Sequence, residues 1–344
     1  MKSRDLSFLV LGAGAVGGIT AALMKKNGYD VEIICKYDEY ASLISNHGLN
    51  VKGTCGSFSV KLPAYSSAKL PASKKDIILH ATKATDMVDA AVESAFLLKD
   101  DGCFVSMQNG IVEDDLMTVA GGKKVIGCVT GWGATMESQG NLEMTSAGDF
   151  ILGYPGRPPD EYLSLVADAL SSIVPVRMTD NIMGHLYSKL IINSCITSLG
   201  AICGLYLGKM LSAAKIRRIF IEIIRESVAV ADRMKIRIEV FGGKLDFKKF
   251  IEGTGPVSDF RRHQMIRLIG FKYRRLKSSS LQSLERGKPS EIDYLNGYIV
   301  RNAEKHNIKV PVNKAVVRII HEIEAKKRII SKENFNDPAF DRFN

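Results

Sequence analysis

The feature that most constrains the fold of this chain is a glycine-rich turn near its start, GAGAVG at residues 12–17. The turn follows an apolar strand candidate, Leu6–Leu11, and opens a helical pattern that runs to about Lys26. Glycines at this spacing let the backbone turn tightly and approach a pyrophosphate, which the positive end of the helix stabilises. The sequence therefore predicts an N-terminal dinucleotide-binding domain. The expected cofactor contacts in the turn are Gly12, Ala13, Gly14, Ala15, Val16 and Gly17.

Short apolar segments recur along the first half of the chain. They predict strands at Val31–Cys35, Ile77–Ala81, Cys103–Met107 and Val125–Thr130. Helical patterns lie between several of these segments. Alternation of this kind is typical of an α/β fold in which a mostly parallel, doubly wound sheet of the Rossmann type carries helices on its faces.

The pattern changes after residue 135. Gly140-Asn141 predicts a hairpin turn between Met136–Ser138 and Leu142–Thr145, and a short strand is predicted at Val174–Met178. The remainder is almost entirely helical to about residue 328, with blocks at Ile182–Ala201, Ala213–Met234, a basic stretch through Ser283, Glu291–His306 and Asn313–Arg328. We therefore expect a Rossmann-type domain at residues 1–180, an all-helical substrate and catalytic domain at 181–330, and a loose polar tail at 331–344.

The composition, 46% hydrophobic and 24% charged, is that of an ordinary globular protein. The six cysteines form no CxxC pair, and the six histidines are scattered, so we expect free thiols in a reducing compartment and no metal site. Four glycines break the apolar stretch near the N-terminus, and no apolar run approaches the ~18 consecutive residues that a membrane span needs. A cytoplasmic enzyme without a membrane partner is the expectation.

The net charge of +10 is unevenly distributed. Residues 244–288 hold twelve Lys and Arg against four Asp and Glu. A field of that sign favours anionic ligands such as phosphates and carboxylates, but solvated helix faces explain the same charge. A nucleotide-sensing or nucleic-acid-binding protein is a further alternative. No known recognition motif occurs in the segment, so we expect no nucleic acid partner.

The end of the second predicted strand bears on the choice of dinucleotide. Proteins that bind NAD usually place an acidic residue there to hold the ribose diol, whereas this chain has Lys36. A cation at this position can pair with a 2′-phosphate, so NADPH is the expected cofactor. Asp38 and Glu39 follow closely and keep NAD open, and a solvated loop lysine is the simpler alternative for Lys36.

Six motifs, taken in order, resemble the ketopantoate reductase (2-dehydropantoate 2-reductase) family over nearly the whole chain. They are GAGAVGG at 12–18, TKA at 82–84, QNG at 108–110, SKLIIN at 188–193, SSSLQ at 278–282 and SEIDYLNG at 290–297. Each motif alone is unspecific, but their order and spacing together are specific. The resemblance implies an NADPH-dependent reductase that converts 2-dehydropantoate to pantoate, on the route to pantothenate and coenzyme A.

The resemblance also assigns roles to individual residues. It places Lys36 and Lys83 near the phosphorylated end of NADPH and Asn109 beside both nicotinamide and substrate. Ala134 is also expected to contact the cofactor. Lys189 becomes the general acid, and Glu291 contacts the ligand and orients that lysine. The substrate contacts that it implies are Asn109, Asn193, Thr197 and Ser279.

The spacing in the first helical block agrees with such a site. Hydride addition to a ketone builds negative charge on the carbonyl oxygen, which needs a positioned proton donor. His185, Lys189, Asn193 and Thr197 follow at steps of four and share one helix face. His185 is a rival acid without a matching motif, and a snorkelling surface lysine is the alternative for Lys189.

One departure from the family pattern concerns the substrate. The family commonly has a second asparagine four residues after Asn193, where this chain has Thr197. A hydroxyl reaches less far than an amide and lacks its paired donor and acceptor. Another branched or aromatic 2-oxo acid is therefore the alternative substrate. The helical second half is also compatible with a homodimer.

Overall fold

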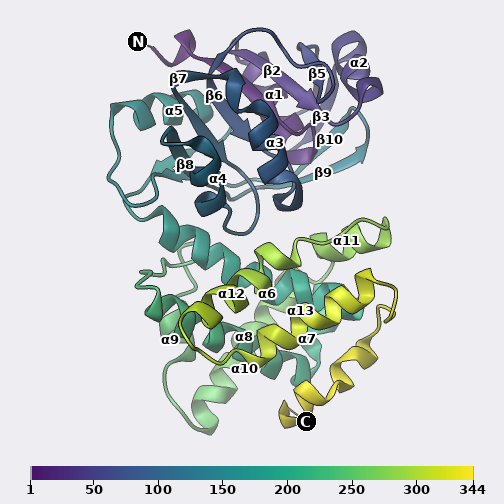
Figure 1. Ribbon diagram of the computed structural model, residues 1–344. Coiled ribbons are helices and arrows are strands. Elements are labelled where there is room, and N and C mark those ends of the chain that lie inside the picture. Colours follow the sequence, from purple (N-terminus) through teal and green to yellow (C-terminus); the bar gives the residue numbers. More distant parts are fainter. Residues whose placement is uncertain (1, 344) are drawn as a thin grey trace. The chain divides into compact units, whose positions relative to one another are not determined.

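The computed structural model describes residues 2–343, which divide into two compact units (Figure 1). The chain up to Gln108 together with Val112–Ile182 forms the first, which we call the sheet unit. Asn109–Ile111 and the chain from Met183 onward form the second, the helical unit. This division lies close to the predicted boundary at residues 180 and 181, apart from the short segment after residue 108.

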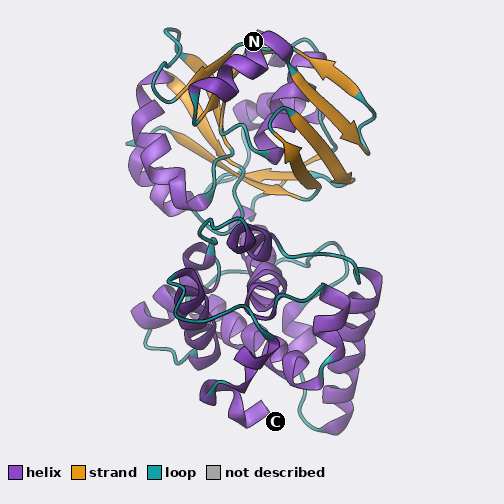
Figure 2. Ribbon diagram, turned by 90° about the vertical axis from the view of Figure 1, so that its right-hand side faces the viewer, coloured by secondary structure: helices purple, strands orange, loops and turns teal. Residues whose placement is uncertain are grey.

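An eight-stranded sheet forms the centre of the sheet unit (Figure 2). Its order is β12 (Val176–Met178), β11 (Phe150–Gly153), β8 (Lys124–Thr130), β7 (Leu98–Ser106), β6 (Lys75–His80), β1 (Ser7–Leu11), β2 (Asp30–Cys35) and β5 (Ala64–Ser66). The strands from β5 to β8 are parallel, and β11 runs antiparallel to β8. Because the chain starts at β1 and builds outward on both sides, the sheet is doubly wound. The predicted fold class is confirmed.

A second, four-stranded sheet joins distant parts of the chain. Its order is β4 (Phe58–Val60), β3 (Leu49–Gly53), β10 (Asn141–Ser146) and β9 (Gly133–Ser138). The predicted hairpin around Gly140 is present as β9 and β10, which pair antiparallel. β3 pairs with β10 in parallel, and neither β3 nor β4 was predicted.

Helix α1 (Ala15–Lys26) contacts strands of both sheets and is the central element of this core. A side chain at Gly18 would place its Cβ 2.5 Å from Leu142 of β10, so glycine allows the close approach of helix and strand. α2 (Asp38–His47), α3 (Met87–Ser94), α4 (Glu113–Ala120) and α5 (Glu161–Ser171) complete the unit. The core contains the inward side chains of β1, β2 and β6 with Ile19 and Leu170 from the helices.

The helical unit contains eight α-helices within the described residues. They are α6 (Ile182–Cys203), α7 (Leu207–Ser212), α8 (Ala214–Arg233), α9 (Phe247–Ile251), α10 (Pro256–Lys272), α11 (Ser279–Glu285), α12 (Asn296–Lys305) and α13 (Pro311–Glu324). α8 contacts α7, α9, α10, α12 and α13 and is therefore the hub of the unit. By length and composition α6 could cross a membrane, but 83% of its most apolar window is buried, as in the core helix of a soluble protein.

The predicted helix at Glu291–His306 begins later than expected. Ile292–Tyr294 forms a single 3₁₀ turn, and Leu295 then adopts a non-helical backbone with ψ −104°. α12 starts only at Asn296. Glu291 therefore lies before the 3₁₀ turn and outside α12.

The expectation of a loose tail at residues 331–344 is also wrong for the residues that the structure describes. Two 3₁₀ helices, η5 (Lys332–Asn336) and η6 (Pro338–Phe343), bury Phe335 and Phe340. The carboxylate of Asp337 forms ion pairs with Arg318 at 2.7 Å and Arg328 at 3.1 Å. Buried aromatic rings and a doubly paired carboxylate anchor this segment to α13.

Candidate active site

The glycine turn lies at the point where the strand order of the large sheet reverses. Ala81, which follows β6, donates its backbone N–H to Leu11 of β1 at 2.8 Å, and Gly12 donates to Ile34 of β2 at 3.0 Å. Gly12 has φ +100°, and a Cβ there would lie 2.8 Å from the backbone nitrogen of Thr82. The carboxyl ends of β1, β2 and β6 therefore meet at one turn that only glycine can form, where ligands bind in such sheets.

The other two glycines of the motif differ in what surrounds them. A Cβ on Gly17 would lie 2.1 Å from the carbonyl oxygen of Gly12, so this glycine packs helix against turn. A Cβ on Gly14 would meet no atom within 4 Å, and Gly14 is an exposed N-cap without a side-chain hydrogen bond. The first N–H groups of α1 have no hydrogen-bond partner within the helix. Gly14 has no side chain that would cover them. These residues fit the pyrophosphate of a dinucleotide.

The predicted phosphate contact, Lys36, is exposed and directly follows β2. Its carbonyl oxygen accepts a hydrogen bond from Ser67 Oγ at 3.2 Å, which fixes the backbone at this position. Asp38, the acidic residue that would instead favour NAD, begins α2 and forms an ion pair with Lys69 at 2.9 Å. Hydrogen bonds from Ser66 and Lys69 lower the pKa of Asp38. Two cations therefore border the end of β2, and the nearby carboxylate is already paired.

Lys83 is the other predicted contact in this region. It is half-buried and is the N-cap residue of a 3₁₀ turn, Ala84–Asp86, immediately after the segment that follows β6.

A buried histidine that sequence reasoning missed supports the loops at this edge. His80 ends β6, and its Nδ1 lies 2.7 Å from Gln108 Nε2 and 3.1 Å from Thr82 Oγ1. An amide nitrogen can only donate, so Nδ1 is the acceptor and the ring is neutral. Desolvation lowers the pKa of His80 to about 4. The signal available in the sequence is a histidine that closes the apolar strand DIILH.

The turn that contains Asn109 follows β7 and is anchored on both sides. Ser106 donates to the buried carboxylate of Glu113 at 2.5 Å, and Val112 donates its N–H to the same side chain at 3.0 Å. Burial raises the pKa of Glu113. On the helical unit, a Cβ at Gly110 would lie 2.5 Å from the carbonyl oxygen of Tyr294, so this glycine packs directly against the SEIDYLNG segment. The half-buried Asn109 is thus placed in the helical unit.

Ala134 lies elsewhere in the sheet unit. It is a half-buried residue of β9 and pairs with Met144 of β10 in the small sheet. β9 contacts α1, the helix that the glycine turn opens.

Lys189, Asn193 and Thr197 lie on α6 and share one helix face, as their spacing predicted. Lys189 and Asn193 are half-buried, whereas Thr197 is only 7% exposed. His185, the alternative general acid, precedes them on the same helix face and is half-buried.

A buried polar network fixes the neighbouring face of α6, and sequence reasoning missed it. Ser198 donates to Asn296 Oδ1 at 2.5 Å, and Asn296 Nδ2 donates to Asn313 Oδ1 at 2.9 Å and to the carbonyl oxygen of Ser194 at 3.3 Å. Asn313 Nδ2 donates to Glu226 at 2.7 Å. These side chains come from α6, α12, α13 and α8. The network therefore sets the rotation of α6 about its axis, and with it the direction in which Lys189, Asn193 and Thr197 point.

Ser279 is exposed and is the first residue of α11. The N-cap of this helix is Ser278, whose Oγ accepts the N–H of Leu281 at 3.3 Å. A Cβ on Gly200 of α6 would lie 2.7 Å from that hydroxyl. The start of α11 therefore packs against α6 within one turn of Thr197.

Glu291 is half-buried and follows an anchored serine. Ser290 donates both its N–H, at 2.8 Å, and its hydroxyl, at 2.7 Å, to the carboxylate of Glu324 at the end of α13. The carbonyl oxygen of Glu291 accepts the N–H of Tyr294 at 3.0 Å. Hydrogen bonds therefore fix the backbone on both sides of Glu291.

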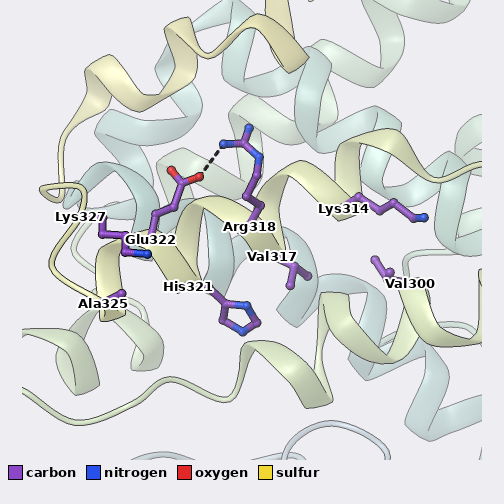
Figure 3. Close-up of a pocket in the computed structure, with 8 residues that line it drawn as sticks. All are labelled: Val300, Lys314, Val317, Arg318, His321, Glu322, Ala325 and Lys327. Atoms are coloured by element: carbon purple, nitrogen blue, oxygen red, sulfur yellow. Dashed lines mark hydrogen bonds and ion pairs between the residues drawn. The ribbon is translucent and has the colours of Figure 1, made fainter.

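A cavity of about 490 Å³ opens on the helical unit away from these residues, beside α12 and α13 (Figure 3). Its lining is Val300, Lys314, Val317, Arg318, His321, Glu322, Ala325 and Lys327. Arg318 and Glu322, one turn apart on α13, form an ion pair at 2.8 Å, and Lys314 pairs with Glu304 at 2.7 Å. Lys314, Arg318 and Glu322 are already in ion pairs, and none of the predicted site residues lines the cavity.

The cysteines and potential metal ligands have simple surroundings. All six cysteines are free, and five of them are buried. Residues 2–343 contain no cluster of three or more His, Cys, Asp or Glu side chains that could hold a metal ion.

Two family models match this chain. Residues 8–157 match the model described as ketopantoate reductase PanE/ApbA, and residues 181–324 match its C-terminal counterpart. Among curated relatives, the 2-dehydropantoate 2-reductase of Pyrococcus abyssi is 29% identical, with coverage of 90% of this chain and 94% of that protein. The 2-dehydropantoate 2-reductase of Archaeoglobus fulgidus is 26% identical, with coverage of 92% and 97%.

Solved structures show the same fold. A PanE/ApbA family ketopantoate reductase from Ralstonia eutropha superposes with a TM-score of 0.80 at 27% identity and covers 94% of this chain and 99% of its own. D-mandelate dehydrogenase in complex with NADH and anilino(oxo)acetate has a TM-score of 0.80 at 22% identity, covering 93% and 98%. This chain, with both halves of the family pattern in order, belongs to the ketopantoate reductase family of nicotinamide-dependent oxidoreductases.

Proposed function

We propose that this protein reduces 2-dehydropantoate to pantoate with NADPH, using Lys189 as the general acid. The observation that carries the proposal is the glycine turn at the switch point of the sheet, where Gly14 leaves α1 open to a pyrophosphate. The family models over both halves of the chain, and relatives named as 2-dehydropantoate 2-reductases, support the substrate.

The residues of the helical unit would supply the acid and the substrate contacts. When bound, the reduced nicotinamide supplies a hydride to the carbonyl carbon of the 2-oxo acid. The Lys189 ammonium donates a proton to the carbonyl oxygen as negative charge develops there. Asn193 and Thr197, on the same face of α6, can bind the substrate's carboxylate and hydroxyl groups. Ser279 and Asn109 add polar groups from separate segments, and Glu291 holds the ammonium in position.

The preference for NADPH rests on the charge at the end of β2. Lys36 is exposed there, Lys69 pairs with Asp38, and Lys83 follows the adjacent strand β6. A 2′-phosphate at this position gains charge-assisted hydrogen bonds, which the bare ribose of NADH would not. The mandelate dehydrogenase structures contain NADH, so the same fold also accommodates the dinucleotide that lacks this phosphate.

The test of the proposal is the oxidation of NADPH with 2-dehydropantoate as substrate. We expect turnover by the full-length protein, and a kcat about 10²–10⁴-fold lower for Lys189→Ala, as for loss of a general acid. Lys209→Ala removes an exposed lysine of the same unit and should leave kcat unchanged. Absence of turnover at saturating substrate, or a Lys189→Ala variant as fast as the natural protein, contradicts the proposal.

A second candidate keeps the reaction and changes the substrate. Thr197 is buried, and its side chain is shorter than the amide that the family commonly has there. That favours a bulkier, branched or aromatic 2-oxo acid, in line with the mandelate dehydrogenase neighbours. The ratio of kcat/KM for 2-dehydropantoate and for benzoylformate distinguishes the two candidates. Thr197→Asn should shift that ratio toward 2-dehydropantoate.

A further inference from the structure

Helix α10 is labelled in the helical unit in Figure 1. One of its faces carries an exposed apolar stripe. Val257 is 84% exposed, Phe260 66%, Leu268 68% and Phe271 70%. The opposite face is packed, because Ile266 is buried and a Cβ on Gly270 would lie 3.0 Å from Leu211 of α7. Four large apolar side chains on one exposed helix face are more than scattered surface residues and mark an interaction surface.

The apolar positions of the stripe are arranged symmetrically about Gln264. Phe260 and Leu268 lie four residues before and after it, and Val257 and Phe271 lie seven residues before and after it. At 3.6 residues per turn, all five side chains fall within a sector of about 80°. A helix face that reads the same in both directions matches a copy of itself running antiparallel.

We propose that two copies of this chain associate through α10, with the helices antiparallel and a two-fold axis at Gln264. An isologous interface requires a self-complementary patch, which this stripe provides. Val257 then meets the partner's Phe271, and Phe260 meets the partner's Leu268. The carboxamide of Gln264 carries both a donor and an acceptor, so two copies can pair with each other at the axis.

The charges around the stripe set its orientation and its response to salt. The helix dipoles favour antiparallel over parallel pairing of two α10 helices. Arg261 and Lys272 border one side of the stripe and Arg267 the other, all exposed. Two copies bring these like charges closer together, so added salt should strengthen the dimer. Binding to an anionic membrane or a nucleic acid would instead weaken as salt rises.

The oligomeric state tests this directly. In analytical ultracentrifugation of the full-length protein, we expect a monomer–dimer equilibrium that shifts toward dimer with added NaCl. Phe260→Glu and Gln264→Glu should give monomers that stay folded by circular dichroism and keep their reductase activity. Phe96→Glu alters a side chain of similar exposure, 60%, in the sheet unit and should leave the dimer intact. A natural protein that is monomeric at its highest soluble concentration, or a dimer that survives Phe260→Glu, overturns the proposal.

A cross-link locates the axis. Under mild oxidation, Gln264→Cys should form a dimer linked by a disulfide between identical positions, above the background of the natural protein. Leu268→Cys alone should not, because it faces the partner's Phe260. Failure of Gln264→Cys to cross-link overturns the antiparallel arrangement. Binding to phosphatidylserine vesicles that Phe260→Glu abolishes and salt weakens would overturn the second copy in favour of a membrane surface.

Discussion

In the proposed function, the exposed Lys36 at the end of β2 makes the protein prefer NADPH over NADH. We expect Lys36→Asp to weaken NADPH binding about 10–100-fold, because a carboxylate repels the 2′-phosphate and removes a charge-assisted hydrogen bond. NADH, which lacks that phosphate, should bind as well as before or more tightly. Fluorescence titration of both dinucleotides measures the difference, and Lys61→Asp, an exposed charge change in the same unit, is the control. Equal losses for both dinucleotides would place the phosphate elsewhere.

His80 makes the stability of the sheet unit depend on pH. The ring accepts a hydrogen bond from Gln108, and desolvation lowers its pKa from 6.5 to about 4. Since the unfolded chain binds this proton more readily, stability is fully present above about pH 6.5 and falls as the pH drops toward about 4, by about 3 kcal/mol from this group. Urea unfolding at both pH values measures the loss. His80→Asn should be less stable near neutral pH and should lose less on acidification; an unchanged pH dependence would show that another group titrates.

The structural placement of a residue could be predicted from sequence where its cause is local. Gly12 and Gly17 each serve a turn that their own spacing defines, and Lys189, Asn193 and Thr197 share a face because a helix repeats. Arg262 shows the opposite case. It lies in the basic segment that we read as anionic-ligand binding or solvated helix faces, yet it is fully buried and donates to carbonyl oxygens at the end of α9. Net charge along a sequence does not reveal which cations are buried.

Among elements, α13 depends on a cap from another helix. Its N-cap residue is Val310, which has no side-chain acceptor, and Glu226 of α8 accepts the N–H groups of Val312 and Asn313, each at 2.9 Å. Glu226→Gln turns an amide donor toward these donors and should cost about 3 kcal/mol, since buried hydrogen bonds are lost and their partners left unsatisfied. Chemical denaturation measures this loss.

The matched control for that prediction is Glu304→Gln, which removes one exposed ion pair with Lys314. It should change stability by less than about 0.5 kcal/mol. Because Glu226 also anchors the network that reaches Ser194 and Ser198, its variant should lower kcat even under conditions where the protein is fully folded. A stability loss no larger than that of the control would mean that α13 is capped by other means.

Elements with a strong internal pattern were predictable, and those defined by distant partners were not. β1 and α1 follow from an apolar run and a glycine turn. β4 has only three residues of mixed burial, and it exists because β3 pairs with it and with β10, some ninety residues further along. The late start of α12 has the same origin, since Asn296 is held by groups on α6 and α13.

At the scale of the whole molecule, the doubly wound order and the change to helices after residue 182 could be expected from alternating patterns. The return of residues 109–111 to the helical unit and the packing of residues 331–343 could not. The polar side chains of that terminal segment look solvated in sequence, yet Asn334 donates to the carbonyl oxygen of Ile202 at 3.1 Å. Contacts between segments so far apart leave no local pattern.

We also expect NADPH and then pantoate to protect different parts of the chain from hydrogen exchange. NADPH should protect amides of residues 12–18 from hydrogen exchange in the full-length protein and stabilise it by about 3 kcal/mol at a hundredfold excess over Kd. Pantoate added to the NADPH complex should extend protection to α6 around Lys189–Thr197, because the proposed substrate contacts lie there. Pantoate with Lys189→Ala is the comparison and should protect that helix less. If pantoate protected only the sheet unit, the substrate would bind without the helix that carries the proposed acid, and the assignment of Lys189 would fail even if the glycine turn binds NADPH as expected.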